Sequence, residues 1–299
     1  MKLAHITDLH INSADNPERL EQLEFLVKNI FDDGYDHLIV TGDLVDVANE
    51  DDMRLIRQLF ERLGVFDWQK LTVIPGNHDI FGKYELNAER VFVNAMNAAG
   101  NKSIEKLRVF SEIFRDVMTP NDQAHYYFPF IKVIDGPGGG IAIIAFNSVL
   151  ELSLTENPIG SRGYIRREEL NAVENPLVMD FLKDKFVITI SHHGYRVFEP
   201  ENPAEQAFVW SMELINNQEY LQTMKRINTR IALHGHFHRA DSYHVDGIHI
   251  VNGGAFKRAR RTFNSIFIND DGSYEQQFFK YQNAGAASQE EQNEATKLF

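Results

Sequence analysis

The sequence predicts an α/β protein built on mixed β-sheets, and three observations lead to this fold class. Short apolar runs alternate with amphipathic stretches along most of the chain, which favours parallel strands joined by helices. The segment FPFIKVIDGPGGGIAIIAF contains two apolar runs around a Gly/Pro turn, the pattern of an antiparallel hairpin. Further apolar runs toward the C-terminus also have the pattern of antiparallel strands.

Besides the first strand of that hairpin, nine segments are expected to form strands, because each is mostly apolar and is bounded by polar or turn-forming residues. Pro129 places the first hairpin strand at a sheet edge, since proline cannot donate a backbone hydrogen bond. The nine other strands are expected at Lys2–Thr7, Asp36–Thr41, Leu71–Pro75, Gly140–Phe146, Phe186–Ser191, Arg230–His234, Ile248–Asn252, Asn264–Ile268 and Tyr274–Phe279.

Helices are expected between the first strands. Glu18–Asp33 and Asp51–Leu63 each carry apolar residues on one face and stop at Gly34 and Gly64, which suit the left-handed conformation that ends a helix. The segment Ile80–His125 is also mostly helical in pattern (ELNAERVFVNAMNAAG, SIEKLRVFSEIFRDVM) and interrupts the succession of strands. We therefore expect a helical insertion at about 80–125 that covers the functional site.

The length of 299 residues fits a single domain over residues 1–282. Residues 283–299 have little apolar content and are expected to form a mobile tail. The N-terminal MKLAHITDLH lacks an apolar run of signal-peptide length, and no segment has the apolar length of a membrane span. These features predict a cytoplasmic protein without a membrane partner.

Charge and cysteine content exclude some classes of function. With 30 Lys+Arg against 43 Asp+Glu the net charge is −13, the wrong sign for a protein that grips nucleic acid through its overall field. Nucleic acid is therefore not an expected partner. The absence of cysteine excludes disulfides and thiolate metal sites.

The stretch LHGHFHRA places three histidines within five residues: His234, His236 and His238. Gly235 allows the backbone to bend sharply, so that two imidazoles at i and i+2 can converge on one point, as metal ligands do. The alternative is a polar loop that is locally rich in histidine.

Similar polar groups follow the other predicted strands, each at a carboxyl end. In open α/β sheets ligands bind at that edge, because the loops of neighbouring strands meet there. Each group alone also has a plain explanation as a turn, and Asp79 as a helix cap. The groups are Asp8 and His10; Asp43 and Asp46; Asn77, His78 and Asp79; His192 and His193; and His236 and His238.

In this order, D-x-H, GD-x-x-D, GNHD, a histidine pair and GH-x-H resemble the calcineurin-like metallophosphoesterase superfamily. The resemblance runs from Asp8 to His238 and implies a sandwich of two mixed β-sheets flanked by helices, with two metal ions at the carboxyl edge of the strands. Asp43 would bridge the two ions. The implied ligands are Asp8, His10, Asp43 and His238 for one ion and Asp43, Asn77, His192 and His236 for the other.

These residue types suit the implied chemistry. Imidazoles, carboxylates and an amide oxygen without thiolates fit Mn, Fe or Zn. Two such ions lower the pKa of a shared water, and the resulting bridging hydroxide can attack a phosphate ester. The resemblance makes His78 the general acid and Asp46 the group that holds its ring, with a loop hydrogen bond as the alternative for Asp46. The choice of His192 over His193 follows the habit of the family.

The motifs also bear on the substrate. GDLVDVA lacks the arginine that follows this motif in the serine/threonine protein phosphatases, and GNHD differs from their GNHE and from the GNRD of lipid A pyrophosphatases. What remains resembles the bacterial branch that acts on cyclic nucleotides, glycerophosphodiesters and small phosphomonoesters. The expected partner is thus a small phosphate ester. A DNA repair nuclease of the same superfamily and a metal-free scaffold with this fold are the alternatives.

Several residues outside the motifs carry weaker expectations. Phe81 and Tyr84 are expected to line the leaving-group side of the site, and Gly194 stands where many relatives have proline. Further arginines divide into two groups. Arg196 and Arg239 flank ligand loops and are placed to meet a phosphate, whereas Arg162, Arg166 and Arg167 are expected at a solvated helix start.

Overall fold

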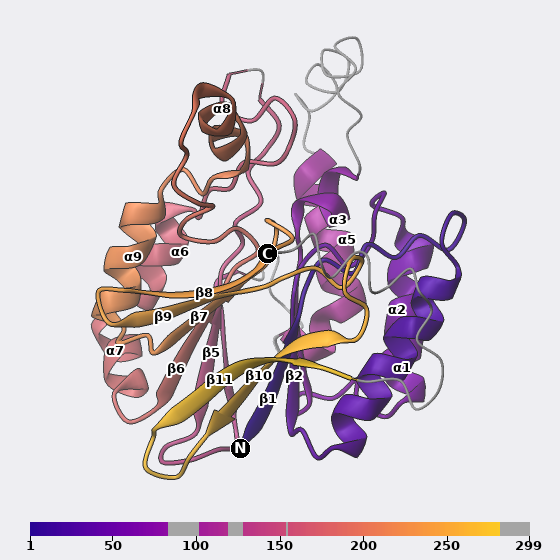
Figure 1. The fold of residues 1–299 in the computed structure, drawn as a ribbon. Coiled ribbons are helices and arrows are strands. Elements are labelled where there is room, and N and C mark those ends of the chain that lie inside the picture. Colours follow the sequence, from indigo (N-terminus) through magenta and orange to yellow (C-terminus); the bar gives the residue numbers. More distant parts are fainter. Residues whose placement is uncertain (83–101, 119–127, 154, 282–299) are drawn as a thin grey trace.

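Two β-sheets pack face to face and helices cover their outer faces (Figure 1). The computed structural model describes residues 1–82, 102–118, 128–153 and 155–281. The α/β sandwich of two mixed sheets expected from the sequence is confirmed. No helix in the described ranges is long and apolar enough to cross a membrane.

The first sheet has the strand order β11-β10-β1-β2-β3. Its central strands β1 (Lys2–Ile6), β2 (His37–Thr41) and β3 (Leu71–Ile74) are parallel. β10 (Thr262–Ile268) runs antiparallel to β1, and β11 (Tyr274–Lys280) antiparallel to β10. These strands match the predicted segments to within two residues at each end.

The second sheet has the order β4-β5-β6-β7-β9-β8. The predicted hairpin is formed by β4 and β5, and β4 is the edge strand, as Pro129 predicts. β5, β6, β7 and β9 are parallel to one another. The strands are β4 (Phe130–Ile134), β5 (Ile141–Ala145), β6 (Phe186–Ile190), β7 (Ile231–His234), β8 (Ala240–Val245) and β9 (Ile248–Gly253).

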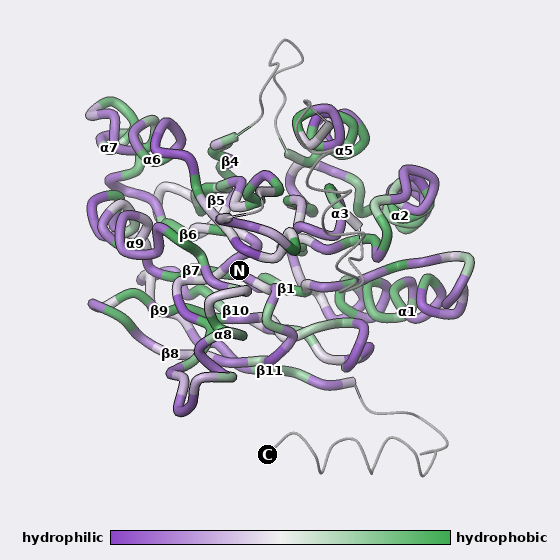
Figure 2. The backbone as a smooth tube through the Cα atoms, turned by 90° about the horizontal axis from the view of Figure 1, so that it is seen from above, coloured by the Kyte–Doolittle hydropathy of each residue, from purple (hydrophilic) through white to green (hydrophobic). Residues whose placement is uncertain are grey.

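The helices lie on two opposite sides of the sheets (Figure 2). α1 (Glu18–Asp32), α2 (Glu50–Arg62) and α5 (Lys102–Met118) join the core of the first sheet. α6 (Arg167–Val173), α7 (Pro176–Leu182) and α9 (Asn217–Arg226) cover the second sheet. α3 (Asn77–Phe81) begins directly after β3, and α8 (Pro203–Met212) stands between β6 and α9 with no buried residue.

The strands of the second sheet bury side chains on both faces, which explains why their sequences are continuously apolar. In β5, Ile141 and Ile143 belong to the core between the two sheets, whereas Ala142 and Ile144 pack against the outer helices. Adjacent side chains of a strand point to opposite faces, so one segment contributes to both cores. The strands of both sheets are thereby fixed in their depth and register.

One predicted strand direction needs correction. The segment of β9 was expected to be antiparallel, but it runs parallel to β7 and is antiparallel only to β8. The sequence analysis missed β8, whose side chains are largely exposed and so lack an apolar pattern. β8 and β9 are joined by Asp246 and Gly247, both with positive φ (49° and 84°), the backbone of a tight hairpin turn. This hairpin brings β9 back beside β7.

The predicted insertion is helical in α5, and the expectation that the insertion covers the functional site stays a prediction. Phe110, Phe114 and Val117 are fully buried, and α5 packs beside α2 over β3 as part of the core. The other helical pattern of this segment, with Tyr84, lies outside the described residues, as does the expected tail at 283–299.

A buried lysine joins the neighbouring edges of the two sheets. Lys132 of β4 is fully buried, and its Nζ donates hydrogen bonds to the carbonyl oxygens of Leu71 in β3 and of Val117 in the last turn of α5. Its ammonium also lies 4.5 Å from the ring centre of Trp68. Burial lowers the pKa of Lys132 to about 7.

We expect Lys132→Met to lower the free energy of unfolding by about 2–4 kcal/mol, because two buried carbonyls lose their donor while most of the side-chain volume is kept. Urea denaturation of both proteins measures the difference. Lys28→Met is the control, since Lys28 pairs with Asp32 on an exposed helix face and its loss should cost less than about 0.5 kcal/mol. An unchanged midpoint for Lys132→Met would show that this link does not stabilise the fold.

Candidate metal centre

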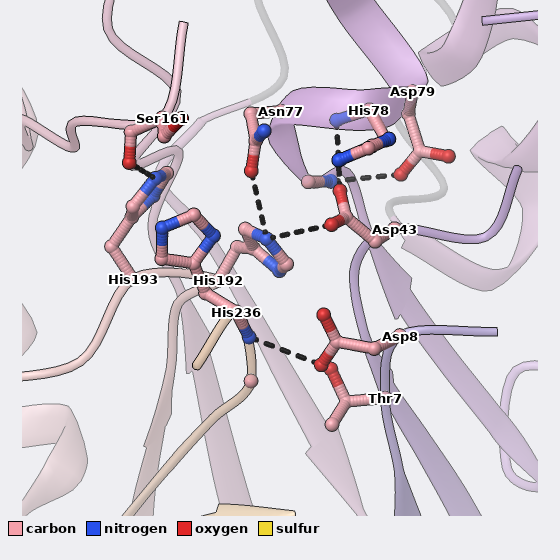
Figure 3. Close-up of polar contacts among 12 residues, drawn as sticks. Thr7, Asp8, Asp43, Asn77, His78, Asp79, Ser161, His192, His193 and His236 are labelled. Atoms are coloured by element: carbon pink, nitrogen blue, oxygen red, sulfur yellow. Dashed lines mark hydrogen bonds and ion pairs between the residues drawn. The ribbon is translucent and has the colours of Figure 1, made fainter. Parts of the chain in front are cut away.

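Five loops converge where the parallel strands of the two sheets end. β1, β2 and β3 of the first sheet are followed by Asp8, Asp43 and Asn77, and β6 and β7 of the second sheet by His192 and His236. Figure 3 shows Asp8 and Asp43 facing His192 and His236 from opposite sides of the site. The predicted site residues are therefore assembled from both sheets.

The backbone of these loops is held in a rare conformation. A positive φ costs a non-glycine residue about 1–2 kcal/mol, so such residues persist only where their surroundings fix them. Here backbone hydrogen bonds do so: the Asp8 amide donates to the Gly42 carbonyl (3.1 Å) and the His10 amide to the Asp43 carbonyl (2.9 Å). Five of the seven predicted ligands have positive φ: Asp8 (54°), His10 (47°), Asp43 (53°), His236 (72°) and His238 (58°).

The first group of candidate ligands consists of Asp8, His10, Asp43 and His238, whose ligand atoms lie within 4.8 Å of one another. His238 Nε2 is 3.0 Å from Asp8 Oδ1 and 3.1 Å from His10 Nε2. His10 Nε2 is 3.5 Å from Asp43 Oδ2. Four donor atoms of the predicted type thus surround one point.

The second group shares Asp43 with the first and adds His192 and His236, all three buried. His192 Nε2 lies 3.3 Å from Asp43 Oδ2 and 3.2 Å from the side-chain oxygen of Asn77. The structure therefore selects His192 over His193 as the histidine at the centre. Asp43 Oδ2 is the atom that the two groups have in common.

Each central aspartate has one oxygen fixed by the backbone and one without a hydrogen-bond donor. Asp43 Oδ1 accepts from the His78 amide (2.8 Å), and Asp8 Oδ2 accepts from the His236 amide (3.0 Å). Among the described residues, nothing donates to Asp43 Oδ2 or Asp8 Oδ1, and His236 Nε2 also has no partner. Buried polar atoms are rarely left in this state. All three atoms point to positions that a cation would satisfy.

The distances within the groups also fit bound metal ions. Ligands about 2.1 Å from one ion are separated from each other by about 3.0–3.4 Å in octahedral or tetrahedral geometry. The contacts of Asp43 Oδ2 and Asp8 Oδ1 with the nearest histidines, 3.0–3.5 Å, are of this size. Nitrogen and oxygen donors without thiolates suit Mn, Fe or Zn. The residues present fit two ions that share Asp43.

Two of the histidines are oriented by hydrogen bonds through their outer ring nitrogens. His10 Nδ1 donates to the Asp46 carboxylate (3.0 Å), and His192 Nδ1 donates to the Thr41 carbonyl (2.8 Å). These contacts leave Nε2 of both rings with a free lone pair that faces the centre. Such outer partners typically fix ring orientation at metal sites and increase the basicity of the ligand.

The charges in the centre are strongly coupled. Burial by itself would raise the pKa of Asp8 and of Asp43, but the neighbouring histidines, first His238 for Asp8 and His192 for Asp43, hold both well below the usual range. Burial would lower the pKa of His192, and the charge of Asp43 overcomes it and raises this pKa to about 9. For His236 burial prevails and its pKa is low. Both carboxylates are therefore ionised at neutral pH.

Asp46 differs from its expected place. Its carboxylate was expected to hold the ring of His78, but it lies 3.8 Å from His78 Nδ1 and accepts its hydrogen bond from His10 instead. The ring of His78 is held by the backbone carbonyl of Asp46 at 3.0 Å. The chain turns at the end of the GD-x-x-D motif. The side chain of Asp46 therefore points toward His10, which follows β1, and its carbonyl points toward His78 in α3.

Three residues that are not candidate ligands also contact the loops or rings of the centre. Asp79 is fully buried and accepts from the amides of Gly76 (2.8 Å) and Val45 (2.9 Å), which fixes the two ligand loops to each other. His193 lies behind His236, with ring centres 4.2 Å apart, and bonds to Ser148 and Ser161. Lys257 Nζ donates to His10 Nε2 at 3.1 Å. Only Asp79 and His193 carried a sequence signal, as neighbours of ligands.

Of the three arginines expected at a solvated helix start, two are found there and one is not. Arg166 and Arg167 are exposed at the start of α6, as expected, but Arg162 is buried, pairs with Glu213 and lies over the ring of Trp210. Its two terminal nitrogens donate to the Glu156 carbonyl and to Glu213, which holds the side chain within the fold and away from the solvated surface. Arg196 pairs with Glu199 at 3.4 Å, and contact of Arg196 or Arg239 with a phosphate stays a prediction.

The family model of the calcineurin-like phosphoesterases matches residues 1–240, so the chain belongs to this family. Among solved structures, a dimetal phosphatase from Danio rerio aligns over 94% of this chain and 99% of its own, at 11% identity and a TM-score of 0.57. A purple acid phosphatase from yellow lupin aligns over 94% of this chain and 51% of its own, at 12% identity and a TM-score of 0.53. These two structures share the fold. No curated protein sequence matches the chain.

Gly235 is required for the close approach of the β7 loop to β1. A methyl group at this position would lie 1.9 Å from Thr7 Oγ1 and 2.5 Å from Asp8 Oδ2, and both acceptors belong to buried short side chains that cannot move away. We expect Gly235→Ala to separate Asp8 from His236 and to lower the number of metal ions retained per chain after dialysis.

Gly34→Ala is the matched control for this substitution. Gly34 has a φ of 74° and open space around it, so alanine there should cost about 1 kcal/mol of stability and leave the metal content unchanged. Elemental analysis of both variants measures the difference. Wild-type metal retention by Gly235→Ala would contradict the role assigned to this contact.

Proposed function

We propose that this protein hydrolyses phosphate esters with the help of two metal ions of the Mn, Fe or Zn type. The observation that carries this proposal is Asp43 Oδ2, a buried oxygen without a donor that is shared by two groups of metal-ligating side chains. When bound, two such ions would activate a water and stabilise the attacking and leaving oxygens of an in-line displacement at phosphorus. The phosphatase names of the two structural relatives support the same class of reaction.

The residues of the chain have separate tasks in this reaction. Asp8, His10 and His238 would hold one ion, and Asn77, His192 and His236 the other, while Asp43 would contribute to both sites. The hydrogen bonds from the His78 and His236 amides prevent both aspartates from rotating away. The centre is therefore preorganised for the transition state, and its backbone strain is offset by these contacts.

In this proposal His78 protonates the leaving oxygen. It adjoins Asn77 at the start of α3, its Nδ1 donates to the Asp46 carbonyl, and its side chain is one-fifth exposed, so Nε2 is the ring nitrogen available to a substrate. In the hydrolysis, the bond from water oxygen to phosphorus would form as the water gives up a proton to solvent, and the ester bond would break as the His78 imidazolium passes its Nε2 proton to the leaving oxygen. A positioned acid accelerates that last transfer when the leaving group is basic.

The proposed substrate is a small phosphate ester, as in the bacterial branch that the motifs resemble. The net charge of −13 opposes a large polyanion as partner, which disfavours the nuclease alternative. In a metal-free scaffold, buried carboxylate and imidazole atoms without partners would destabilise the fold, and no bound ion would offset this cost. Metal analysis of the purified protein separates the enzyme from the scaffold.

Asp43→Asn should cause the greatest loss of metal among single ligand changes, because it weakens both sites at once. We expect wild type to retain two ions per chain after dialysis and the variant fewer than one, with activity toward bis(p-nitrophenyl) phosphate reduced at least 100-fold. Asp270→Asn, an exposed aspartate remote from the centre, is the control. Two tightly held ions in Asp43→Asn would show that Asp43 does not bridge.

His78→Ala should slow the hydrolysis of alkyl phosphate esters by about 10²–10⁴-fold and that of p-nitrophenyl esters much less, since nitrophenolate leaves without a proton. Metal content is measured in parallel, because loss of the amide contact with Asp43 is not expected when only the side chain is removed. Equal losses for both ester types at unchanged metal content would overturn the assignment of His78 as the acid.

A further inference from the structure

A basic segment adjoins the metal centre of this acidic protein. Residues 257–261 read KRARR and follow β9 directly. The segment is tied to the ligand loop of β1: the Phe256 amide donates to the Thr7 carbonyl (3.0 Å) and the Lys257 amide to the Asp8 carbonyl (3.2 Å). Its position beside the centre is thus set by the backbone.

A further cation meets this segment from α1. Arg19, in the first turn of α1, donates to the backbone carbonyl of His10, the residue whose ring Lys257 also contacts. Burial, and next the positive charge of Arg260, lower the pKa of Arg19, while Asp46 and Glu18 act in the opposite direction. Arg19 and Arg260 are therefore close enough to repel each other.

These cations lack carboxylate partners of their own. In the described part of the chain, Arg19, Arg258 and Arg260 form no ion pair, and the Nε atoms of Arg19 and Arg260 are buried without an acceptor. The buried Arg162, whose Nε likewise lacks an acceptor, differs from them because it forms an ion pair with Glu213. Like charges held together and partly desolvated cost free energy unless an anion joins them.

Lys257 is in a similar position. The only acceptor described for its Nζ is His10 Nε2, the atom assigned to a metal ion. When His10 ligates a metal, the Lys257 ammonium loses this acceptor and needs another one nearby. The carboxylates that act on it, those of Asp8, Asp43 and Asp46, already serve the metal centre and its histidines.

We propose that Arg19, Lys257 and Arg260 bind a second phosphate group of the substrate while the phosphate to be cleaved lies at the metal centre. The proposal rests on the proposed function and narrows its substrate class to small organic bisphosphates. Guanidinium groups recognise phosphate through two parallel hydrogen bonds, and buried Nε atoms without acceptors supply such donors. The ammonium of Lys257 contacts His10 at the metal centre.

The activity test compares adenosine 3′,5′-bisphosphate with adenosine 3′-phosphate and adenosine 5′-phosphate, with phosphate release as the readout. We expect wild type to prefer the bisphosphate. Arg260→Gln should lower kcat/KM for the bisphosphate about tenfold or more, the effect of one charge-assisted hydrogen bond, and leave the monophosphates within about threefold. Arg54→Gln, an exposed arginine of α2, is the control that should change neither.

Arg19→Gln is the second variant, and its metal content is checked because Arg19 also contacts the backbone of His10. It should reproduce the selective loss for the bisphosphate. Equal losses for bisphosphate and monophosphates in both variants would assign these arginines to the phosphate that is cleaved and overturn the second subsite.

A binding measurement separates this inference from the proposed function. Inorganic pyrophosphate is titrated calorimetrically into the metal-free protein, where no hydrolysis is required. We expect Arg260→Gln to bind pyrophosphate about tenfold more weakly than wild type and Arg54→Gln to bind it equally. Pyrophosphate binding that is unchanged in Arg260→Gln would overturn the subsite. If metal-loaded wild type cleaves none of the three nucleotides while this loss of binding is seen, the proposed activity on them fails and the anion site stands.

Discussion

The shared oxygen of Asp43 is the constraint on which the rest of the site depends. One carboxylate oxygen of Asp43 fixes the start of α3 through the His78 amide, and the other lies at the point where both ligand groups meet. Because the residue is buried and flanked by histidines, its carboxylate stays ionised. A single side chain thereby couples the placement of the loops after β2 and β3 to the chemistry of the centre.

The packing of the two sheets brings the ligand-bearing loops of both sheets together. Three parallel strands of one sheet and two of the other end at the same place, so ligands far apart in the sequence come within a few ångströms. Close approach requires glycine where the sheets meet, as at Gly235, and strained backbone at Asp8, His10 and Asp43. Hydrogen bonds between neighbouring loops offset that strain. The site is therefore rigid because the fold overdetermines its backbone.

Charged residues that are not candidate ligands also contribute to the electrostatic potential at the site. The candidate ligands of the centre include two buried carboxylates, whereas Arg19 and Arg260 add positive charge for which the described residues supply no ion pair. In a protein of net charge −13 this local excess is a property of one surface and not of the whole chain. A metal centre and an adjoining anion site suit a ligand that carries more than one phosphate.

Apolar periodicity and closely spaced polar motifs are local signals, so the sequence by itself predicted every described strand except β8, the main helices, and the polar groups that follow the strands. The division of these groups into candidate ligands and neighbours came from the family resemblance. His192 needed the family resemblance, since nothing local distinguishes it from His193. Tertiary structure alone decided what depends on distant neighbours. At the level of the fold, β9 runs parallel to β7 and α5 packs in the core. At the level of side chains, the Asp46 carboxylate contacts His10, Arg162 is buried against Glu213, and Lys257 reaches the centre. These outcomes follow from packing and hydrogen bonding between segments far apart along the chain, for which a single sequence carries no periodic or local signal.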